Sequence, residues 1–390
     1  MSGEAIRYDA AGIQVLEGWE AVRKRPGMYI GSTDERGLHH LVFEVADRAV
    51  NEILAARSGS IDITLTPDGG VCVADDGPGV PLDRAEGSGS PGLEALLTGM
   101  HVGARPGDRR DVALGFCGVG PAVVNALSRR MTAEVRREGV RWVQEYARGV
   151  AVTPLTEAGA TTGSGTAIAF RPDTDIFGTA AYSFDRLAER FRELAFLNRS
   201  LDISLTDRRD PAASRSERFR FPGGARDFVV FLDGHPTEPA PTDVIAFEHE
   251  DPRMAGVLEV AFRWHGSREG QVRSFVNSRP TIDGTHAGGF RHGVVAAVDA
   301  YARKRRLLKA TDPGLDTDRI CAGLTAVVSV KLDRVEFEGA TLGMLGNPEV
   351  HGCVEQAVRE HLGRWLEEHP ERAAAVLDRI IRTDHGADDD

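Results

Sequence analysis

The sequence is poor in lysine and cysteine. Of its 47 basic residues only four are lysines, at positions 24, 304, 309 and 331, and the rest are arginines. A GC-rich genome explains this bias most simply, and a mechanism that requires a lysine has only these candidates. The four cysteines, at positions 72, 117, 321 and 353, form no Cys-x-x-Cys pair. The usual zinc spacings are therefore excluded, no metal site is expected, and a reducing compartment is favoured.

Long hydrophobic runs are absent as well. No run approaches the roughly 18 apolar residues of a membrane helix, and residues 1–30 lack the apolar stretch of a signal peptide. We therefore expect a cytoplasmic protein without a membrane partner. Apolar residues make up 41% of the chain, charged residues 27% and aromatic residues 6%, values typical of a globular protein. A length of 390 residues suits two or three domains and, with this composition, excludes disordered, coiled-coil and collagen-like classes.

Positive charge is scarce relative to negative charge. The 47 basic and 59 acidic residues give a net charge of -12. This balance disfavours a nucleic-acid-binding surface over the whole molecule but permits local basic patches, such as residues 302–309. The sequence leaves open whether the chain contacts DNA.

Apolar residues recur with helical spacing between Leu38 and Leu54. They stand at positions 38, 41, 42, 45, 49, 50 and 53, which predicts an amphipathic helix. At about 100° per residue, Glu44, Arg48 and Asn51 share a different face of this helix. A solvated surface acid is the ordinary interpretation of a lone Glu44, so this residue gains weight only from the motifs that follow.

A β-hairpin is predicted after this helix, with strands at residues 61–66 and 71–75. Its second strand runs into Asp75-Asp76-Gly77-Pro78-Gly79. Glycines at such a place let the backbone approach a flat ligand, and a buried carboxylate accepts a hydrogen bond from an exocyclic amine. A tight turn after a strand accounts for the same residues equally well.

Glycines also end the long stretch of residues 84–120, which is rich in Gly, Ser, Pro and Arg and typical of a lid or a disordered loop. Its last part is Gly115-x-x-Gly118-x-Gly120, followed by Pro121 at a plausible first helical position. Backbone N–H groups at a helix N-terminus bind phosphate, although loop glycines alone often produce this pattern.

The remaining chain predicts further strands and helices. Strands are expected at 131–135, 143–147 and 165–170, a helix at 184–197, and a hairpin arm with a domain boundary at 206–224. A second α+β domain follows, with strands at 257–264, 271–278 and 324–332 and helices at 290–308 and 350–369.

Taken together and in order, these motifs resemble the ATPase region of the DNA gyrase B subunit and its topoisomerase IV relative. The segments that carry the resemblance are residues 21–55, 73–81, 115–128, 163–178, 275–291 and 323–332. The resemblance covers nearly the whole chain and implies an α+β protein: a GHKL (Bergerat) α/β sandwich that binds ATP or ADP, then a ribosomal-S5-like transducer domain. We accordingly expect a dimerisation arm at 1–20, a nucleotide-binding domain at 21–222 and a transducer domain at 223–390.

The resemblance also implies roles for individual residues. Glu44 stands at the place of the general base that activates water, and Asp75 at that of the carboxylate that reads the adenine amino group. Thr166 would support the adenine site, and Arg137 would lie at the pocket mouth. The other residues that we expect at the nucleotide are Arg48, Asn51, Gly77, Gly79, Gly118, Val119, Gly120 and, from the partner-reaching arm that also contains Ile13, Tyr8. Simple surface packing is the alternative for Tyr8 and Arg137.

Four departures from the family pattern fall on the chemistry. Arg48 replaces the asparagine that ligates magnesium, so magnesium is not expected at the usual site. The phosphate loop at 114–120 has lost a glycine and its histidine, the lid has lost its tyrosine and contains RPGDRR at 105–110, and Ala340-Thr341-Leu342 replaces Gln-Thr-Lys. Because magnesium and the γ-phosphate lysine are the main electrostatic elements of phosphoryl transfer here, impaired hydrolysis is expected. Alternatively, Arg48 supplies charge in place of the metal.

Three functions compete. The first is a gyrase-B-like adenine-nucleotide-binding protein with degenerate ATPase machinery, a homodimeric clamp or regulatory or immunity homologue and not a complete topoisomerase, because no Toprim segment follows. The second is a small-molecule enzyme that reuses the pocket through Glu44, Arg48 and Cys117, although an inert buried cysteine is the commoner outcome for Cys117. The third is a still-active ATPase subunit of a type II topoisomerase. If nucleotide binds, we expect binding to be independent of magnesium, with Arg48 either in contact with phosphate oxygens or paired with Glu44, four residues away on the same helix.

Overall fold

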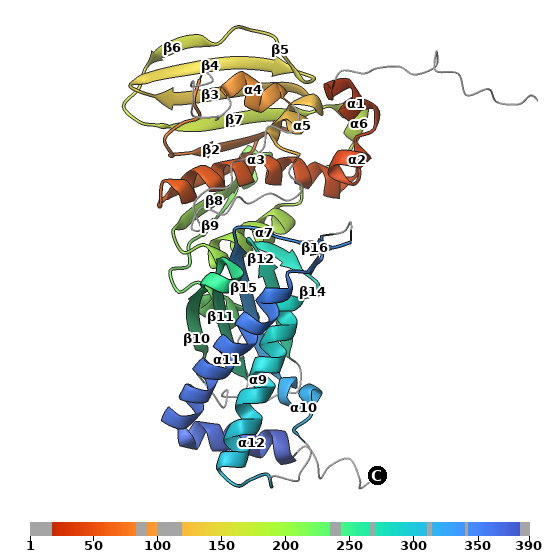
Figure 1. Cartoon of the computed structure of the whole chain (residues 1–390). Helices are drawn as coiled ribbons and strands as arrows, with labels where there is room; N and C mark the ends of the chain where they lie inside the picture. The colour runs from red at the N-terminus through yellow and green to blue at the C-terminus, as the bar shows by residue number, and fades with distance from the viewer. Residues whose placement is uncertain are drawn as a thin grey trace, which may run out of the picture. The chain divides into compact units, whose positions relative to one another are not determined.

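The computed structural model describes residues 18–82, 92–99, 119–234, 243–265, 270–309, 314–339 and 342–382. The chain divides into two compact units (Figure 1). The first unit holds the described residues up to 188 together with 204–217, and the second holds 189–203 and the described residues from 218 onward. Tyr8, Ile13, Cys117, Gly118, the lid segment 105–110 and residues 340–341 lie outside the described residues.

The first unit contains short helices, one long helix and most of a large sheet. Its elements are α1 (Gly18–Lys24), α2 (Gly27–Ile30), α3 (Glu35–Ala55), β1 (Gly59–Leu65), β2 (Val71–Asp75), α4 (Leu93–Thr98), α5 (Pro121–Ala126), β3 (Ser128–Arg137), β4 (Val140–Ala147), β5 (Val150–Ala151), β6 (Thr156–Ala160), β7 (Gly165–Pro172) and α6 (Thr174–Phe177). Three elements contribute residues to both units: α7 (Phe184–Leu197), β8 (Leu201–Asp207) and β9 (Arg215–Phe219).

The sheet of this unit places β2 among the central strands. Nine of the described strands form it in the order β5-β4-β3-β7-β2-β1-β8-β9, with β6 paired to β4. The long helix α3 packs against β1, β2 and β7 (Figure 1). The hairpin expected at 61–75 is present, with Ile61 opposite Asp75. Because α3 runs beside the end of β2, polar residues on α3 can meet the carboxylate that ends this strand.

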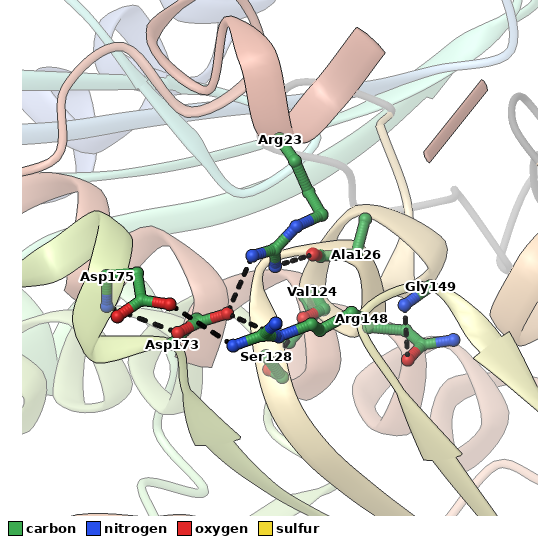
Figure 2. A network of polar contacts seen from close by, with 9 residues as sticks. Arg23, Val124, Ala126, Ser128, Arg148, Gly149, Asp173 and Asp175 are labelled. Atoms are coloured by element: carbon green, nitrogen blue, oxygen red, sulfur yellow. Dashed lines mark hydrogen bonds and ion pairs between the residues drawn. The ribbon is translucent and has the colours of Figure 1, made fainter. Parts of the chain in front are cut away.

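A polar network fastens α1 to the first unit (Figure 2). The guanidinium of Arg23 donates to the carbonyl of Ala126 at 2.9 Å and to Asp173 Oδ2 at 2.7 Å. Arg148 Nε lies 3.0 Å from the same oxygen, and its Nη2 lies 3.2 Å from Asp175 Oδ2. Burial alone would raise the pKa of Asp173, but the hydrogen bonds and positive charges around it lower this pKa.

The second unit has a five-stranded sheet in the order β10-β11-β15-β12-β13 and, besides it, three short strands in the order β14-β17-β16, counting described residues. Its elements are α8 (Ala225–Leu232), β10 (Ile245–Asp251), β11 (Gly256–Trp264), β12 (Gln271–Val276), β13 (Arg279–Thr281), β14 (Asp283–Gly284), α9 (Thr285–Lys304), α10 (Thr317–Cys321), β15 (Leu324–Leu332), β16 (Phe337–Glu338), β17 (Met344–Leu345), α11 (Pro348–Glu368) and α12 (Pro370–Arg382).

Both faces of this sheet are buried. On β15, Val328 and Val330 join a cluster with α9, α11 and α12, whereas Val327 joins a second cluster with Phe196 of α7 and Phe228 of α8. Successive side chains of a strand point to opposite faces. The nearly continuous apolar run of β15 therefore reflects helices on both sides of the strand.

The α+β class expected from the sequence patterns is confirmed, and the expected helix at 184–197 has those bounds. The helix expected at 290–308 instead begins at Thr285 and ends at Lys304. Its expected bounds were wrong because the apolar residues that mark it start one turn inside the helix, and the basic segment 305–308 lies beyond its end. Within the described part of the chain, no helix is both long enough and apolar enough to cross a bilayer.

Candidate functional site

The helix α3 carries the polar residues of the site on a scaffold that packing fixes. Asp34 caps its N-terminus by accepting a hydrogen bond from Arg36 N at 2.8 Å. The seven apolar positions that predicted the helix are all buried. Glu44 and Arg48 are also buried, at 5% and 8% exposure, whereas Asn51 is half-buried. Glu44 and Arg48 are therefore not the solvated surface charges that the simplest interpretation of the helix gives.

The carboxylate of Asp75, 3% exposed, is the best-connected group of the site. Its Oδ1 accepts hydrogen bonds from Gly77 N at 3.0 Å and from Thr166 N at 3.2 Å. The Thr166 hydroxyl oxygen in turn accepts from Val80 N at 3.0 Å. The turn after β2 and the start of β7 are thus held together through Asp75 and Thr166, as buried polar groups require.

Two glycines allow close backbone contacts around the site. Gly165 has φ +132°, and a Cβ there would lie 2.0 Å from the Asp75 carbonyl oxygen. Gly79 has φ +81°, and its Cβ would lie 2.8 Å from the Arg136 carbonyl oxygen. Both positions combine a left-handed backbone with close contact, so they need glycine.

Arg48 forms its ion pair with Asp75 and not with Glu44. Arg48 Nη2 lies 2.5 Å from Asp75 Oδ2, and both side chains are almost fully enclosed. The expected Glu44–Arg48 pair was wrong. Spacing within one helix gives no information about Asp75, which the sheet brings beside α3. Arg48 Nε and Nη1 are buried and have no hydrogen-bond partner among the described residues.

Glu44 is engaged at both oxygens by other groups. Its Oε2 accepts a hydrogen bond from Gly120 N at 2.9 Å, at the residue that precedes α5. Its Oε1 lies 3.3 Å from His40 Nε2, one turn earlier on α3. Gly120 has φ +74°, and with Val119 it is one of the phosphate-loop residues that the structure describes. The expected base and the expected phosphate loop are therefore in contact.

Three residues that we did not single out also belong to this neighbourhood. His40 contacts Glu44 as described, and its spacing of four residues on α3 could have revealed it. Arg136 donates to the Asp75 carbonyl oxygen at 3.2 Å. Burial raises the pKa of Glu52, which the charges of Arg48 and Asp75 also affect in opposite directions. No sequence signal separates Glu52 from the other acids on α3.

Arg137 lies at the same turn as Gly79. Its Nη1 donates to the Gly79 carbonyl oxygen at 3.0 Å, and its Nε contacts Glu138 Oε1 at 3.1 Å. The residue is partly exposed. This placement agrees with a position at the edge of the site, but the same contacts also serve the packing of the turn.

The residues present offer acceptors and donors that suit a nucleotide. Asp75 Oδ2 faces Arg48 but retains a second lone pair, and an adenine amino group needs such an acceptor. Arg48 Nε and Nη1, which have no partner in the described part of the chain, are donors of the kind that phosphate oxygens accept. A magnesium ion prefers oxygen ligands, and Arg48 offers none at its position on α3.

Two family models match the chain. The model described as histidine kinase-, DNA gyrase B-, and HSP90-like ATPase matches residues 33–176, and the model described as DNA gyrase B matches residues 224–389. The first match contains every described residue of the candidate site. The GHKL fold expected from the sequence is thereby confirmed, as is the transducer-type domain after it.

The chain is also similar to curated gyrase B proteins. It is 45% identical to the DNA gyrase B subunit of Streptomyces coelicolor over 97% of this chain and 58% of that protein. It is 42% identical to the novobiocin-resistant DNA gyrase B subunit of Streptomyces niveus, with 96% and 58% coverage. The chain thus spans 58% of the length of these relatives.

Solved structures agree with this assignment. The 43K ATPase domain of Thermus thermophilus gyrase B, solved with an aminocoumarin, has a TM-score of 0.79 and 34% identity, with coverage of 94% of this chain and 95% of that one. The ATP-binding domain of Francisella tularensis topoisomerase IV has a TM-score of 0.76 and 29% identity, with coverage of 94% and 97%. The chain belongs to the DNA gyrase B family and corresponds to the ATPase and transducer region of its members.

Proposed function

We propose that this chain binds adenine nucleotide as a gyrase-B-like ATPase region and turns it over slowly. The observation that carries the proposal is the buried ion pair between Arg48 and Asp75. Asp75 is the residue expected to read the adenine amino group, and Arg48 now holds one of its oxygens. Nucleotide binding then requires Arg48 either to share this oxygen or to leave it.

Arg48 has a second use once it leaves Asp75. Its Nε and Nη1 already lack partners among the described residues, so the guanidinium has donors to offer to an anion. Arginine binds phosphate through such paired donors. We propose that Arg48 turns from Asp75 to the nucleotide phosphates and takes over part of the charge that magnesium supplies elsewhere. Binding then does not depend on magnesium.

Slow turnover is expected because Arg48 and Leu342 stand in place of the magnesium ligand and the lysine that the family uses. A transferring phosphoryl group is stabilised by metal and cationic side chains in the transition state. Leu342 stands where the family has a lysine that contacts the γ-phosphate, and its side chain carries no charge. Glu44 keeps the contacts of a positioned base, with His40 and Gly120 N at its two oxygens. The proposed defect is therefore in charge stabilisation and not in the position of the base.

The similarity to intact gyrase B proteins supports a second candidate, an ATPase with full turnover that works within a type II topoisomerase. The two candidates share nucleotide binding and differ in rate and in magnesium dependence. Homodimer formation and any DNA contact are proposals under both. No contact among the described residues favours a small-molecule enzyme that reuses the pocket, and Cys117 lies outside them.

Calorimetric titration of ATP into the wild-type chain, with magnesium and with EDTA, tests the proposal. We expect the wild-type Kd to change less than about threefold on chelation, whereas Arg48→Asn should bind at least about tenfold more tightly with magnesium, the change that about 1.4 kcal/mol produces. Arg57→Asn, on an exposed residue just past the end of α3, is the matched control. A collapse of wild-type affinity in EDTA would contradict the role of Arg48.

Phosphate release, measured beside the ATPase region of an intact gyrase B, separates the two candidates. We expect slow release that DNA does not stimulate, and Leu342→Lys alone should not restore it while Arg48 remains. Turnover equal to that of the intact relative would favour the second candidate. A chain that binds no adenine nucleotide at all would contradict both candidate functions.

A further inference from the structure

The helices α9 and α11 of the second unit approach each other unusually closely. A Cβ on Gly289 would lie 2.4 Å from the carbonyl oxygen of His351, and one on Gly293 would lie 2.7 Å from that of Glu355. The two helices run side by side in Figure 1. Because small residues let the backbones meet here, side chains at the edge of the contact can reach across it.

Three side chains of the types that ligate metal ions gather at this edge. His292 of α9 and His351 of α11 face each other, with Nδ1 of the first 3.0 Å from Nε2 of the second. Their ring centroids are 5.0 Å apart, and the rings are inclined by 68°. Glu355 lies one turn after His351 on α11, and its Oε2 is 3.7 Å from His351 Nδ1. One ligand atom from each residue lies within 4.8 Å of the other two.

We propose that His292, His351 and Glu355 bind a zinc ion that joins α9 to α11. Zinc takes two imidazoles and a carboxylate, with water in the remaining position, at Zn–N distances of about 2.0–2.1 Å. Tetrahedral geometry then separates the two nitrogens by about 3.3 Å, close to the observed 3.0 Å, and both rings turn from each other toward the ion. The carboxylate of Glu355 must swing inward, which its partial exposure permits.

The donor set argues for zinc and against the alkaline-earth ions. Calcium and magnesium take oxygen ligands, and two of the three groups here are imidazoles. His292 is exposed and the other two residues are half-buried, so the ion can enter from solvent. Nothing in the nucleotide chemistry of the first unit uses this cluster. The alternative is a plain hydrogen bond between two neutral histidines, in which one ring donates and the other accepts.

The test is calorimetric titration of ZnCl2 into the tag-free chain after removal of metal with EDTA. We expect one zinc equivalent that His292→Gln and His351→Gln each abolish or weaken at least about tenfold. His249→Gln is the matched control, because His249 also lies near a second histidine, His361, at 6.0 Å between ring centroids, but without a third ligand among the described residues. Zinc that binds elsewhere, for instance at cysteine, would survive both ligand variants.

Two further measurements keep the test decisive. Zinc should raise the Tm of the wild-type chain, because it binds the folded state, and should not do so in the ligand variants. If a histidine variant fails to fold, Glu355→Gln, at a half-buried helix position, should still weaken zinc binding at least about threefold, because the amide lacks the charge of the carboxylate ligand. Absence of any zinc equivalent, or equal binding by wild type and all three ligand variants, would overturn the proposal and leave the histidine hydrogen bond.

Discussion

Arg48 changes what the carboxylate at the end of β2 can do. Asp75 Oδ1 accepts two backbone N–H groups, and Oδ2 accepts from the guanidinium. Asp75 and Arg48 therefore differ in the hydrogen bonds that each makes outside the ion pair. Asp75 keeps two hydrogen bonds without Arg48, whereas Arg48 without Asp75 loses the acceptor of its Nη2, and its Nε and Nη1 already lack partners among the described residues.

This inequality predicts an asymmetry between two substitutions. Asp75→Asn should destabilise the chain by about 3–5 kcal/mol, the cost of leaving a buried charge unpaired. Arg48→Asn should cost clearly less, since the carboxylate keeps its backbone donors. Urea unfolding of both variants beside the wild type measures the difference. Equal costs for the two variants would mean that the ion pair is not the source of the asymmetry.

The polar residues of the site could be predicted individually, but their pairing could not. Glu44, Asp75 and Thr166 stand in motifs that the sequence displays. The partner of Arg48 lies 27 residues away, on a strand that only the fold brings beside α3. Spacing on one helix favours Glu44, but Gly120 N and His40 engage that carboxylate instead. The pairing of Arg48 with Asp75 depends on how the strands are arranged in the sheet, and the periodicity of a single segment does not predict that arrangement.

At the scale of elements, the start of β7 is fixed by a glycine that touches β2. A Cβ at Gly165 would overlap the Asp75 carbonyl oxygen, whereas a Cβ at Gly163 would find its nearest atom at 4.0 Å. Gly165 also has φ +132°, a conformation that L side chains rarely adopt. The two glycines are close in sequence, but they differ in the room available for a Cβ atom and in backbone strain.

We therefore predict that Gly165→Ala destabilises the chain by about 2–4 kcal/mol, from backbone strain and the clash together. It should also weaken adenine-nucleotide binding, because the strand moves away from Asp75. Gly163→Ala is the matched control and should change the unfolding free energy by less than about 0.5 kcal/mol. Thermal unfolding and ATP titration of the two variants provide the comparison, and a neutral Gly165→Ala would contradict the role of the contact.

The network around Asp173 predicts a pH dependence. The folded-state pKa of this carboxyl lies below its ordinary value of 3.8, through Arg23, Asp175 N and Arg148, which together outweigh burial. A carboxyl with a lowered pKa stabilises the fold above its ordinary pKa, and this contribution is lost as pH falls through the folded-state pKa. Arg23 and α1 should therefore loosen in acid.

Asp173→Asn should accordingly destabilise the chain at pH 7 by about 1–3 kcal/mol, the cost of losing hydrogen bonds to charged groups. The gap between variant and wild type should stay nearly constant down to about pH 5 and shrink below about pH 4. Urea unfolding across this pH series measures it. A gap that stays constant into strong acid would show that the charge of Asp173 is not the stabilising feature.

At the scale of the whole molecule, the sequence patterns predicted some elements and missed others. The apolar strand β15 and helix α11 were predictable because their burial patterns are long and regular. The helix α12 was not singled out, because only His369 separates it from α11 and the apolar residues of α12 lie outside the pattern of α11. Short strands such as β14, β16 and β17, with two residues each, carry no periodicity.

The last prediction concerns assembly. Residues 1–20 resemble the arm by which family members dimerise, with Tyr8 and Ile13 at the matching positions, so we predict a homodimer that nucleotide binding favours. The chain without residues 1–15 should stay monomeric under the same conditions. Sedimentation velocity with ATP, with a non-hydrolysable analogue and without nucleotide distinguishes monomer from dimer in each condition. The same measurement on Arg48→Asn, with and without magnesium, shows whether dimer formation responds to the metal.

A wild-type chain that stays monomeric at high concentration with every adenine nucleotide, together with a truncation that changes nothing, would show that the arm has lost this role. If instead the truncated chain dimerises as well as the full one, the interface lies elsewhere.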